Sequence, residues 1–207
     1  MQNVQLLIHG QSVDASNQAT FERISPIDGS VATKAAAATL EDVDRAIDSA
    51  QQAFKVWSKL SPTERRLRLL KAADLMDQKT EQFIQTGMQE TGSTATWYGF
   101  NVHLAANMLR EAAAMTTQID GSLIPSDVPG NLAMGVRVPC GVIVGIAPWN
   151  APVILATRAL AMPLACGNTV VLKASEACPA THRLIGEVLH EAGLGEGVVN
   201  VITHAAE

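Results

Sequence analysis

Residues 142–152 read V-I-V-G-I-A-P-W-N-A-P, and after an intervening apolar stretch residues 167–176 read G-N-T-V-V-L-K-A-S-E. The run Val142–Ala147 is rich in β-branched residues, which predicts a short strand buried on both faces. Pro152 suits the first turn of a helix, Gly167 suits its end, and Thr169–Leu172 predicts a second buried strand. A strand, a helix and a strand in this order predict a βαβ unit of an α/β fold, in which the two strands are parallel.

Polar or unusual residues follow each of the two predicted strands. The segment Ala147–Asn150 follows the first strand, and Lys173–Glu176 follows the second. Ligands of open parallel sheets bind at the carboxyl ends of the strands. The sequence therefore predicts a binding site where these two segments meet.

The two motifs at this separation resemble the aldehyde dehydrogenase superfamily, NAD(P)-dependent enzymes that oxidise aldehydes to acids. The resemblance runs collinearly through the chain, including A-F-x-x-W at 53–57 and E-T-G at 90–92. It implies that Asn150 is catalytic and donates its side-chain amide to the oxyanion of a thiohemiacetal. It also implies cofactor-binding residues at the nicotinamide and, around Lys173 and Glu176, at the adenosine ribose: Ile146, Ala147, Pro148, Trp149, Lys173, Ala174, Ser175 and Glu176.

Each of these roles has a plainer alternative on the sequence alone. Asn150 could be a turn residue that caps the next helix. Lys173 and Glu176 could form an exposed ion pair at the end of a strand. If Glu176 does bind the ribose, its carboxylate accepts hydrogen bonds from the 2′-hydroxyl and repels a 2′-phosphate, which favours NAD over NADP.

The substrate of the family is a small-molecule aldehyde, and three residues are candidates to line its entry path. Ala151 and Arg158 fall on one face of the predicted helix, and Trp97 lies in an earlier one. A Trp stacks on aromatic rings and an Arg binds anionic or hydroxyl substituents. The chain resembles the branch that acts on aromatic aldehydes such as salicylaldehyde or vanillin. The alternative is a core Trp and a buried structural ion pair.

The rest of the chain predicts strands, then helices, then a ribbon. Val4–Ile8 is a strand candidate in an N-terminal β-meander, and helices are expected to begin after Thr39 and Ser61. The basic residues of the second helix read as a solvated face. The Gly- and Pro-rich segment 119–140 predicts an extended ribbon that in the family pairs with other subunits, so a homodimer or tetramer is expected. We therefore expect N-terminal strands and helices of the cofactor-binding domain over 1–118, the ribbon over 119–140 and the first part of an NAD-binding, Rossmann-like parallel sheet over 141–207.

Composition narrows the class of protein. The 207 residues carry a net charge of −5 with no basic run, which argues against nucleic acid or an anionic membrane as a partner. No signal peptide or membrane span is read, and the odd number of cysteines favours reduced thiols in a cytoplasmic protein. The histidines show no ligand spacing, so no metal site is predicted. Cys140, Cys166 and Cys178 lie outside the family's catalytic context and read as inert packing thiols.

The family reaction needs a cysteine nucleophile and a glutamate base, and neither is found in family context among these residues. The sequence therefore looks like the N-terminal part of a truncated aldehyde dehydrogenase fold, without the catalytic domain. We expect this chain alone to have no dehydrogenase activity. The competing hypothesis is a non-catalytic module that binds a dinucleotide or acts in assembly.

Overall fold

A five-stranded sheet lies at the centre of the computed structural model, which describes residues 1–204. Its strand order is β3-β2-β10-β9-β8, and β8 (Val142–Ile146), β9 (Thr169–Lys173) and β10 (Val199–Ile202) are parallel. Helix α5 (Pro152–Ala165) connects β8 to β9, and α6 (Pro179–Glu191) connects β9 to β10. The predicted parallel βαβ unit is confirmed, and a second unit follows it.

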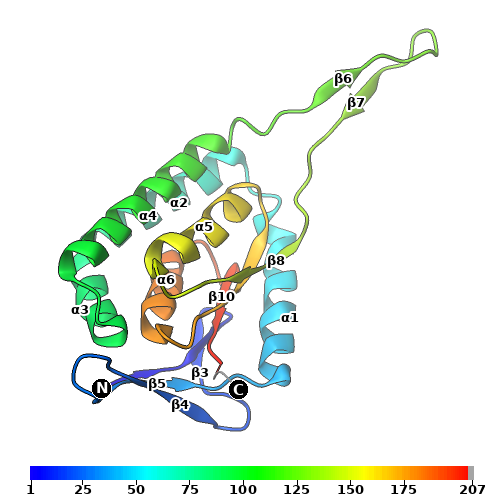
Figure 1. Cartoon of the computed structure of the whole chain (residues 1–207). Coiled ribbons are helices and arrows are strands. Elements are labelled where there is room, and N and C mark those ends of the chain that lie inside the picture. The colour runs from blue at the N-terminus through cyan, green and yellow to red at the C-terminus, as the bar shows by residue number, and fades with distance from the viewer. Residues whose placement is uncertain (205–207) are drawn as a thin grey trace.

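Helices cover the sheet on both sides (Figure 1). Helix α1 (Leu40–Trp57) packs on β9 and β10 from one side, and α5 and α6 pack from the other. Outside α5 and α6 lie α2 (Pro62–Gln78), α3 (Thr80–Thr91) and α4 (Ala95–Met115). Side chains of β9 alternate between the two cores, because Val170 and Leu172 pack with the larger helical layer whereas Val171 packs with α1.

The N-terminal strands depart from the predicted meander. The run Val4–Ile8 is interrupted at Gln5, so β1 (Gln2–Val4) and β2 (Leu6–Ile8) belong to different sheets. Strand β2 pairs with β10 and with β3 (Gln11–Val13), whereas β1 joins a three-stranded sheet with β4 (Thr20–Ile24) and β5 (Val31–Ala36). The pairing partners that place β1 and β2 in different sheets, β5 and β10, lie far along the chain. A local run of apolar residues could not predict these partners.

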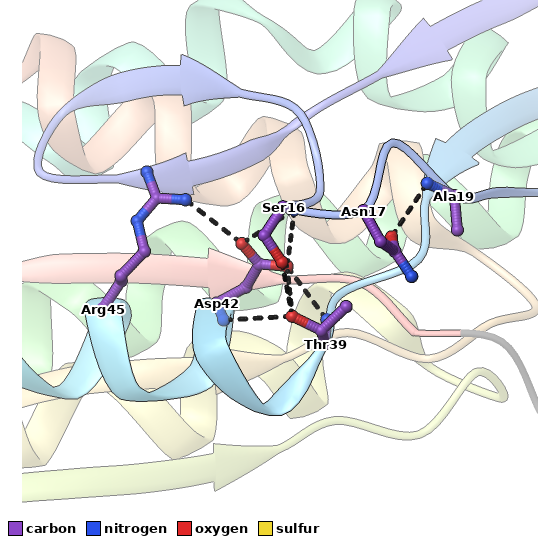
Figure 2. A network of polar contacts seen from close by, with 6 residues as sticks. All are labelled: Ser16, Asn17, Ala19, Thr39, Asp42 and Arg45. Atoms are coloured by element: carbon purple, nitrogen blue, oxygen red, sulfur yellow. Dashed lines mark hydrogen bonds and ion pairs between the residues drawn. The ribbon is translucent and has the colours of Figure 1, made fainter.

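The two predicted helix starts are both confirmed as capping boxes. Thr39 and Asp42 cap α1 reciprocally, as Ser61 and Glu64 cap α2. Asp42 does more than the motif requires, because its buried carboxylate also accepts the Ser16 amide at 3.0 Å and is met by Arg45 at 3.2 Å (Figure 2). The network thus fastens the loop before β4 to the first turn of α1.

Strand β8 is not buried on both faces as predicted. It is the edge strand of the sheet, and Val144 and Ile146 are 59% and 74% exposed. Gly145 faces α5, where an added Cβ would lie 3.2 Å from Ala159. Val144 and Ile146 point to the opposite face, where α1 lies mainly over β9 and β10 and leaves them uncovered.

The predicted solvated basic face of α2 is also wrong for two of its members. Arg65 is buried and donates from Nε to the Ala165 carbonyl at 3.0 Å and from its other guanidinium end to the Leu60 carbonyl. Arg68 donates to the Leu194 carbonyl at 3.2 Å and lies over the Trp57 ring. These arginines therefore hold the C-terminal end of α5 and the loop after α6 in place, a role that depends on carbonyls far along the chain.

The segment after α4 forms an antiparallel ribbon of β6 (Ser122–Ile124) and β7 (Ala133–Gly135) that projects from the body (Figure 1). Its apolar side chains are exposed, including Leu123, Met134 and Val136. The predicted extended ribbon is thus confirmed. Within residues 1–204, no helix combines the length and the apolar character that crossing a membrane requires.

Candidate cofactor and oxyanion site

The strand register brings the two predicted site segments to the same edge of the sheet. Ile146 of β8 lies opposite Lys173 of β9, and the Ala147 amide donates to the Lys173 carbonyl at 3.1 Å. Beyond this point the two strands end: β8 leads into the Pro148–Asn150 turn, and β9 leads into the loop Ala174–Glu176. The structure therefore juxtaposes the segments that the sequence paired, although the role of each residue in binding or catalysis stays a prediction.

Asn150 lies exposed between β8 and α5. The N-cap of α5 is Ala151, and no side chain caps this helix. Among residues 1–204 the Asn150 carboxamide forms no hydrogen bond, so the helix-capping alternative is wrong. Its amide group is consequently available to an oxygen atom that arrives from solvent.

The predicted substrate-lining residues lie on two packed helices, Trp97 on α4, Ala151 at the start of α5 and Arg158 within it. Trp97 of α4 donates from its indole nitrogen to the Asn150 carbonyl at 3.4 Å and stacks on Phe100, with ring centroids 5.7 Å apart. Ala151 is half-buried beside it, and Arg158 lies exposed further along α5. Trp97 is 39% exposed, so the alternative of a core Trp and a buried Arg ion pair is wrong.

Lys173 and Glu176 form an ion pair of 3.4 Å in which both side chains remain partly exposed. The alternative of an exposed ion pair at the strand end is thus confirmed, and cofactor binding by these residues stays a prediction. The hydrogen bond from its own backbone amide, assisted by the charges of Lys173 and Arg23, lowers the pKa of the Glu176 carboxyl below its ordinary value. Glu176 is therefore ionised at neutral pH. An exposed ion pair of this kind is weak, so both groups can turn toward ligand hydroxyls at little cost.

The remaining predicted cofactor residues divide into exposed and buried groups. Ile146, Pro148 and Trp149 are exposed and present apolar surface, with Trp149 57% exposed. Ala147, Ala174 and Ser175 have buried side chains and set the course of the backbone behind that surface. Beside Lys173 opens a mainly apolar hollow of about 630 Å³, whose wall includes Thr39, Val43 and Ile202.

Two buried polar residues support this edge: Glu90, which the sequence marked only as part of the E-T-G motif, and His182, which the sequence did not mark at all. Glu90 accepts hydrogen bonds from the Ala180 and Thr181 amides at the start of α6, at 2.8 and 2.9 Å, and from the Thr181 and Thr33 hydroxyls. Burial raises the pKa of Glu90 and these four donors oppose the rise. His182, also fully buried, joins the Ser175 amide to the Pro152 carbonyl. Motif spacing alone could not reveal either bridge.

The three cysteines differ in their surroundings. Cys178 is buried, and burial raises the pKa of its thiol well above the ordinary value. Cys166 is half-buried, but Cys140 is exposed, which corrects its description as a packing thiol. The raised pKa keeps Cys178 in the unreactive thiol form.

Comparison with known proteins places the chain in a family. Residues 13–207 match the Aldehyde dehydrogenase family. A vanillin dehydrogenase of Pseudomonas fluorescens is 65% identical over 205 residues, which are 99% of this chain and 42% of that protein.

Solved structures agree with this match. A salicylaldehyde dehydrogenase from Pseudomonas putida G7, complexed with salicylaldehyde, superposes with a TM-score of 0.97 at 47% identity, over 99% of this chain and 42% of that one. PnpE in complex with nicotinamide adenine dinucleotide superposes with a TM-score of 0.95 at 40% identity, over 99% of this chain and 42% of that one. The chain thus spans less than half the length of the relatives it matches. On the family match and these identities, the chain belongs to the aldehyde dehydrogenase family.

Proposed function

We propose that this chain is the N-terminal, cofactor-binding part of an NAD-dependent dehydrogenase that oxidises an aromatic aldehyde to the carboxylic acid. The observation that carries the proposal is the register of β8 and β9, which sets the Asn150 turn beside the Lys173–Glu176 loop. The similarity to vanillin and salicylaldehyde dehydrogenases supports the aromatic substrate.

In this proposal Asn150 stabilises the negative charge that develops on the aldehyde oxygen. Its side-chain amide is neutral and does not cap helix α5, while the Trp97 indole donates to the backbone carbonyl of Asn150. A neutral amide can donate a hydrogen bond where negative charge develops without bringing a charge of its own to the site. Loss of one such donor typically lowers kcat by about 10²–10³-fold.

The residues at the strand ends fit a dinucleotide. Ionised Glu176 accepts hydrogen bonds from ribose hydroxyls and Lys173 donates one, while exposed Ile146 and Trp149 offer apolar surface to the nicotinamide ring. When bound, NAD⁺ would supply the hydride acceptor of the oxidation. The Glu176 carboxylate would disfavour the 2′-phosphate of NADP⁺ by charge repulsion.

The aromatic substrate is proposed to approach Asn150 past Trp97. The Trp97 and Phe100 rings form a stacked aromatic surface next to the turn, and both are partly exposed. Such surfaces favour flat aromatic ligands through offset or edge contacts. Arg158 lies further along α5 and would meet a polar ring substituent.

We further propose that the ribbon of β6 and β7 pairs with another subunit in a homodimer or tetramer. Its exposed apolar residues and unpaired strand edges support this assignment, because an uncovered edge of this kind promotes association. The 207 residues by themselves are proposed to be inactive, since the cysteine nucleophile and glutamate base are not found in family context among them.

The experiment compares the 207-residue chain with the full-length polypeptide in which these residues occur. Formation of the reduced cofactor, NADH from NAD⁺ or NADPH from NADP⁺, is measured with vanillin, salicylaldehyde and acetaldehyde. We expect activity only in the full-length protein, highest with an aromatic aldehyde and NAD⁺, and about 10²–10³-fold lower kcat in Asn150→Ala. Full-length protein that forms no NADH with any aldehyde, or NADH formation by the 207 residues alone, would contradict the proposal.

A further inference from the structure

His182 is a buried residue that contacts the backbone of both segments of the candidate site, the loop after β9 and the start of α5. It belongs to α6 and is fully buried. Its Nδ1 atom lies 3.0 Å from the Ser175 amide nitrogen, and its Nε2 atom lies 3.2 Å from the Pro152 carbonyl oxygen. Ser175 directly precedes Glu176, and Pro152 follows Asn150 and Ala151. One ring therefore spans from the proposed ribose-binding loop to the start of the helix behind the proposed oxyanion donor.

The chemistry of the two partners fixes the tautomer of this ring. A backbone amide can only donate and a backbone carbonyl can only accept, so Nδ1 accepts from Ser175 and Nε2–H donates to Pro152. Burial, with a smaller contribution from the Lys173 charge, lowers the pKa of His182 to about 4, although the Pro152 carbonyl opposes this. A second proton on Nδ1 would face the Ser175 N–H, so both observations agree on a neutral imidazole at neutral pH.

Other groups around the ring do not replace either contact. The Cys178 sulfur lies 3.8 and 4.0 Å from the two ring nitrogens, and burial keeps it in the thiol form. Glu90 is committed to the first turn of α6 through Ala180 and Thr181. His182 is thus the side chain that joins both loops directly.

We propose that His182 is a positioning residue that sets the Lys173–Glu176 loop relative to Asn150, and so couples cofactor binding to oxyanion stabilisation. This inference rests on the proposed function, which assigns ribose binding and oxyanion stabilisation to the two loops. The two hydrogen bonds of His182 do not depend on that assignment. The ring reaches no exposed surface, so it acts through the backbone of Ser175 and Pro152 and does not touch a ligand.

Two substitutions in the full-length protein separate the two contacts. In His182→Gln the longer carboxamide can still donate near the Nε2 position to Pro152, but Ser175 loses its acceptor. In His182→Asn the carboxamide oxygen can still accept near the Nδ1 position from Ser175, but the contact with Pro152 is lost. His190→Gln, an exposed position on the same helix, is the matched control.

Three measurements are made: hydrogen–deuterium exchange of peptides across 173–178 without cofactor, the Kd for NAD⁺ by calorimetry, and kcat and KM. In His182→Gln we expect exchange at Ser175 and the Kd for NAD⁺ to rise by about tenfold each, with kcat less affected, as one buried amide loses its partner. In His182→Asn we expect a nearly unchanged Kd and a fall in kcat of about tenfold, because the Asn150 turn loses its support.

The outcomes distinguish the inference from a merely structural role and from failure of the proposed function. A structural role would lower the melting temperature of both variants and shift Kd and kcat together, which would overturn the inference, as would values equal to those of His190→Gln. If one variant does not fold, the other still tests the inference, because each is expected to change either the Kd for NAD⁺ or kcat but not both equally. If the wild type forms no NADH, the proposed function fails, and the exchange at Ser175 alone decides whether His182 holds this loop.

Discussion

The Asp42 network offers a stringent test of how the loop before β4 is fastened to helix α1. The perturbation is Asp42→Ala, which removes a fully buried carboxylate (Figure 2). That carboxylate accepts the Thr39 amide at 2.9 Å, the Thr39 hydroxyl at 3.0 Å and the Ser16 amide at 3.0 Å. The change therefore breaks the capping box of α1 and the link to the loop before β4 at the same time.

The expected magnitude follows from these contacts. Loss of a helix cap costs about 0.5–2 kcal/mol. A buried amide left without an acceptor costs about 1–3 kcal/mol, and the Ser16 amide lies near the low end because Ser16 is exposed to water. Together these give a local destabilisation of roughly 1.5–3 kcal/mol. Asp44→Ala, an exposed position on the same helix, should stay within about 0.5 kcal/mol.

The assay is hydrogen–deuterium exchange of peptides covering 14–20 and 38–46 in the purified protein. Burial alone would raise the pKa of Asp42, but the Thr39 and Ser16 hydrogen bonds outweigh it and lower the pKa below 3.8. A lowered folded-state pKa means that the stabilisation is complete above 3.8 and is lost as pH falls through the folded-state value. Exchange in Asp42→Ala equal to that in Asp44→Ala, or a stabilisation that grows toward acid pH, would refute this reasoning.

Two further predictions address the support of α6 and the thiols. Glu90→Gln should leave one of the Ala180 and Thr181 amides without an acceptor, which destabilises the first turn of α6 by about 1–3 kcal/mol. The effect should be measured as faster hydrogen–deuterium exchange of peptides across 178–183. Unchanged exchange would show that the carboxylate is dispensable. Iodoacetamide should alkylate exposed Cys140 much faster than Cys178, whose burial raises the thiol pKa, and mass spectrometry after partial reaction checks the order. Equal rates at the two cysteines would contradict the structure.

Local chemistry explains what the sequence could predict. Each capping pair lies within one helical turn, so the sequence predicted both helix starts: Thr39 with Asp42, and Ser61 with Glu64. The parallel pairing of β8 and β9 followed from a strand, a helix and a strand in succession, because such crossovers have one favoured geometry. The juxtaposition of the Asn150 turn and the Lys173–Glu176 loop followed from that pairing.

Contacts between distant parts of the chain account for the failures. The sequence predicted Arg65 as a solvated cation because its partner, the Ala165 carbonyl, lies 100 positions away in the chain. The division of β1 from β2 depends on β5 and β10, and the exposure of β8 depends on where α1 happens to lie. The bridging roles of His182 and Glu90 could not be predicted for the same reason, since the partners of a buried polar residue lie far from it in sequence.

Glu90 also explains why the start of α6 is not available as an anion site. The N-terminus of a helix that follows a parallel strand is ordinarily an anion site, because its free amides and the helix dipole favour negative charge. In α6 the amides of Ala180 and Thr181 are already bound by the Glu90 carboxylate. A phosphate at that position would have to displace a buried carboxylate and would meet its charge. Under the proposed function, recognition at this edge therefore falls to the side chains Lys173 and Glu176. The two connections at this edge of the sheet therefore differ: the turn after β8 leaves Asn150 exposed, whereas the start of α6 after β9 is already occupied by a buried carboxylate from α3.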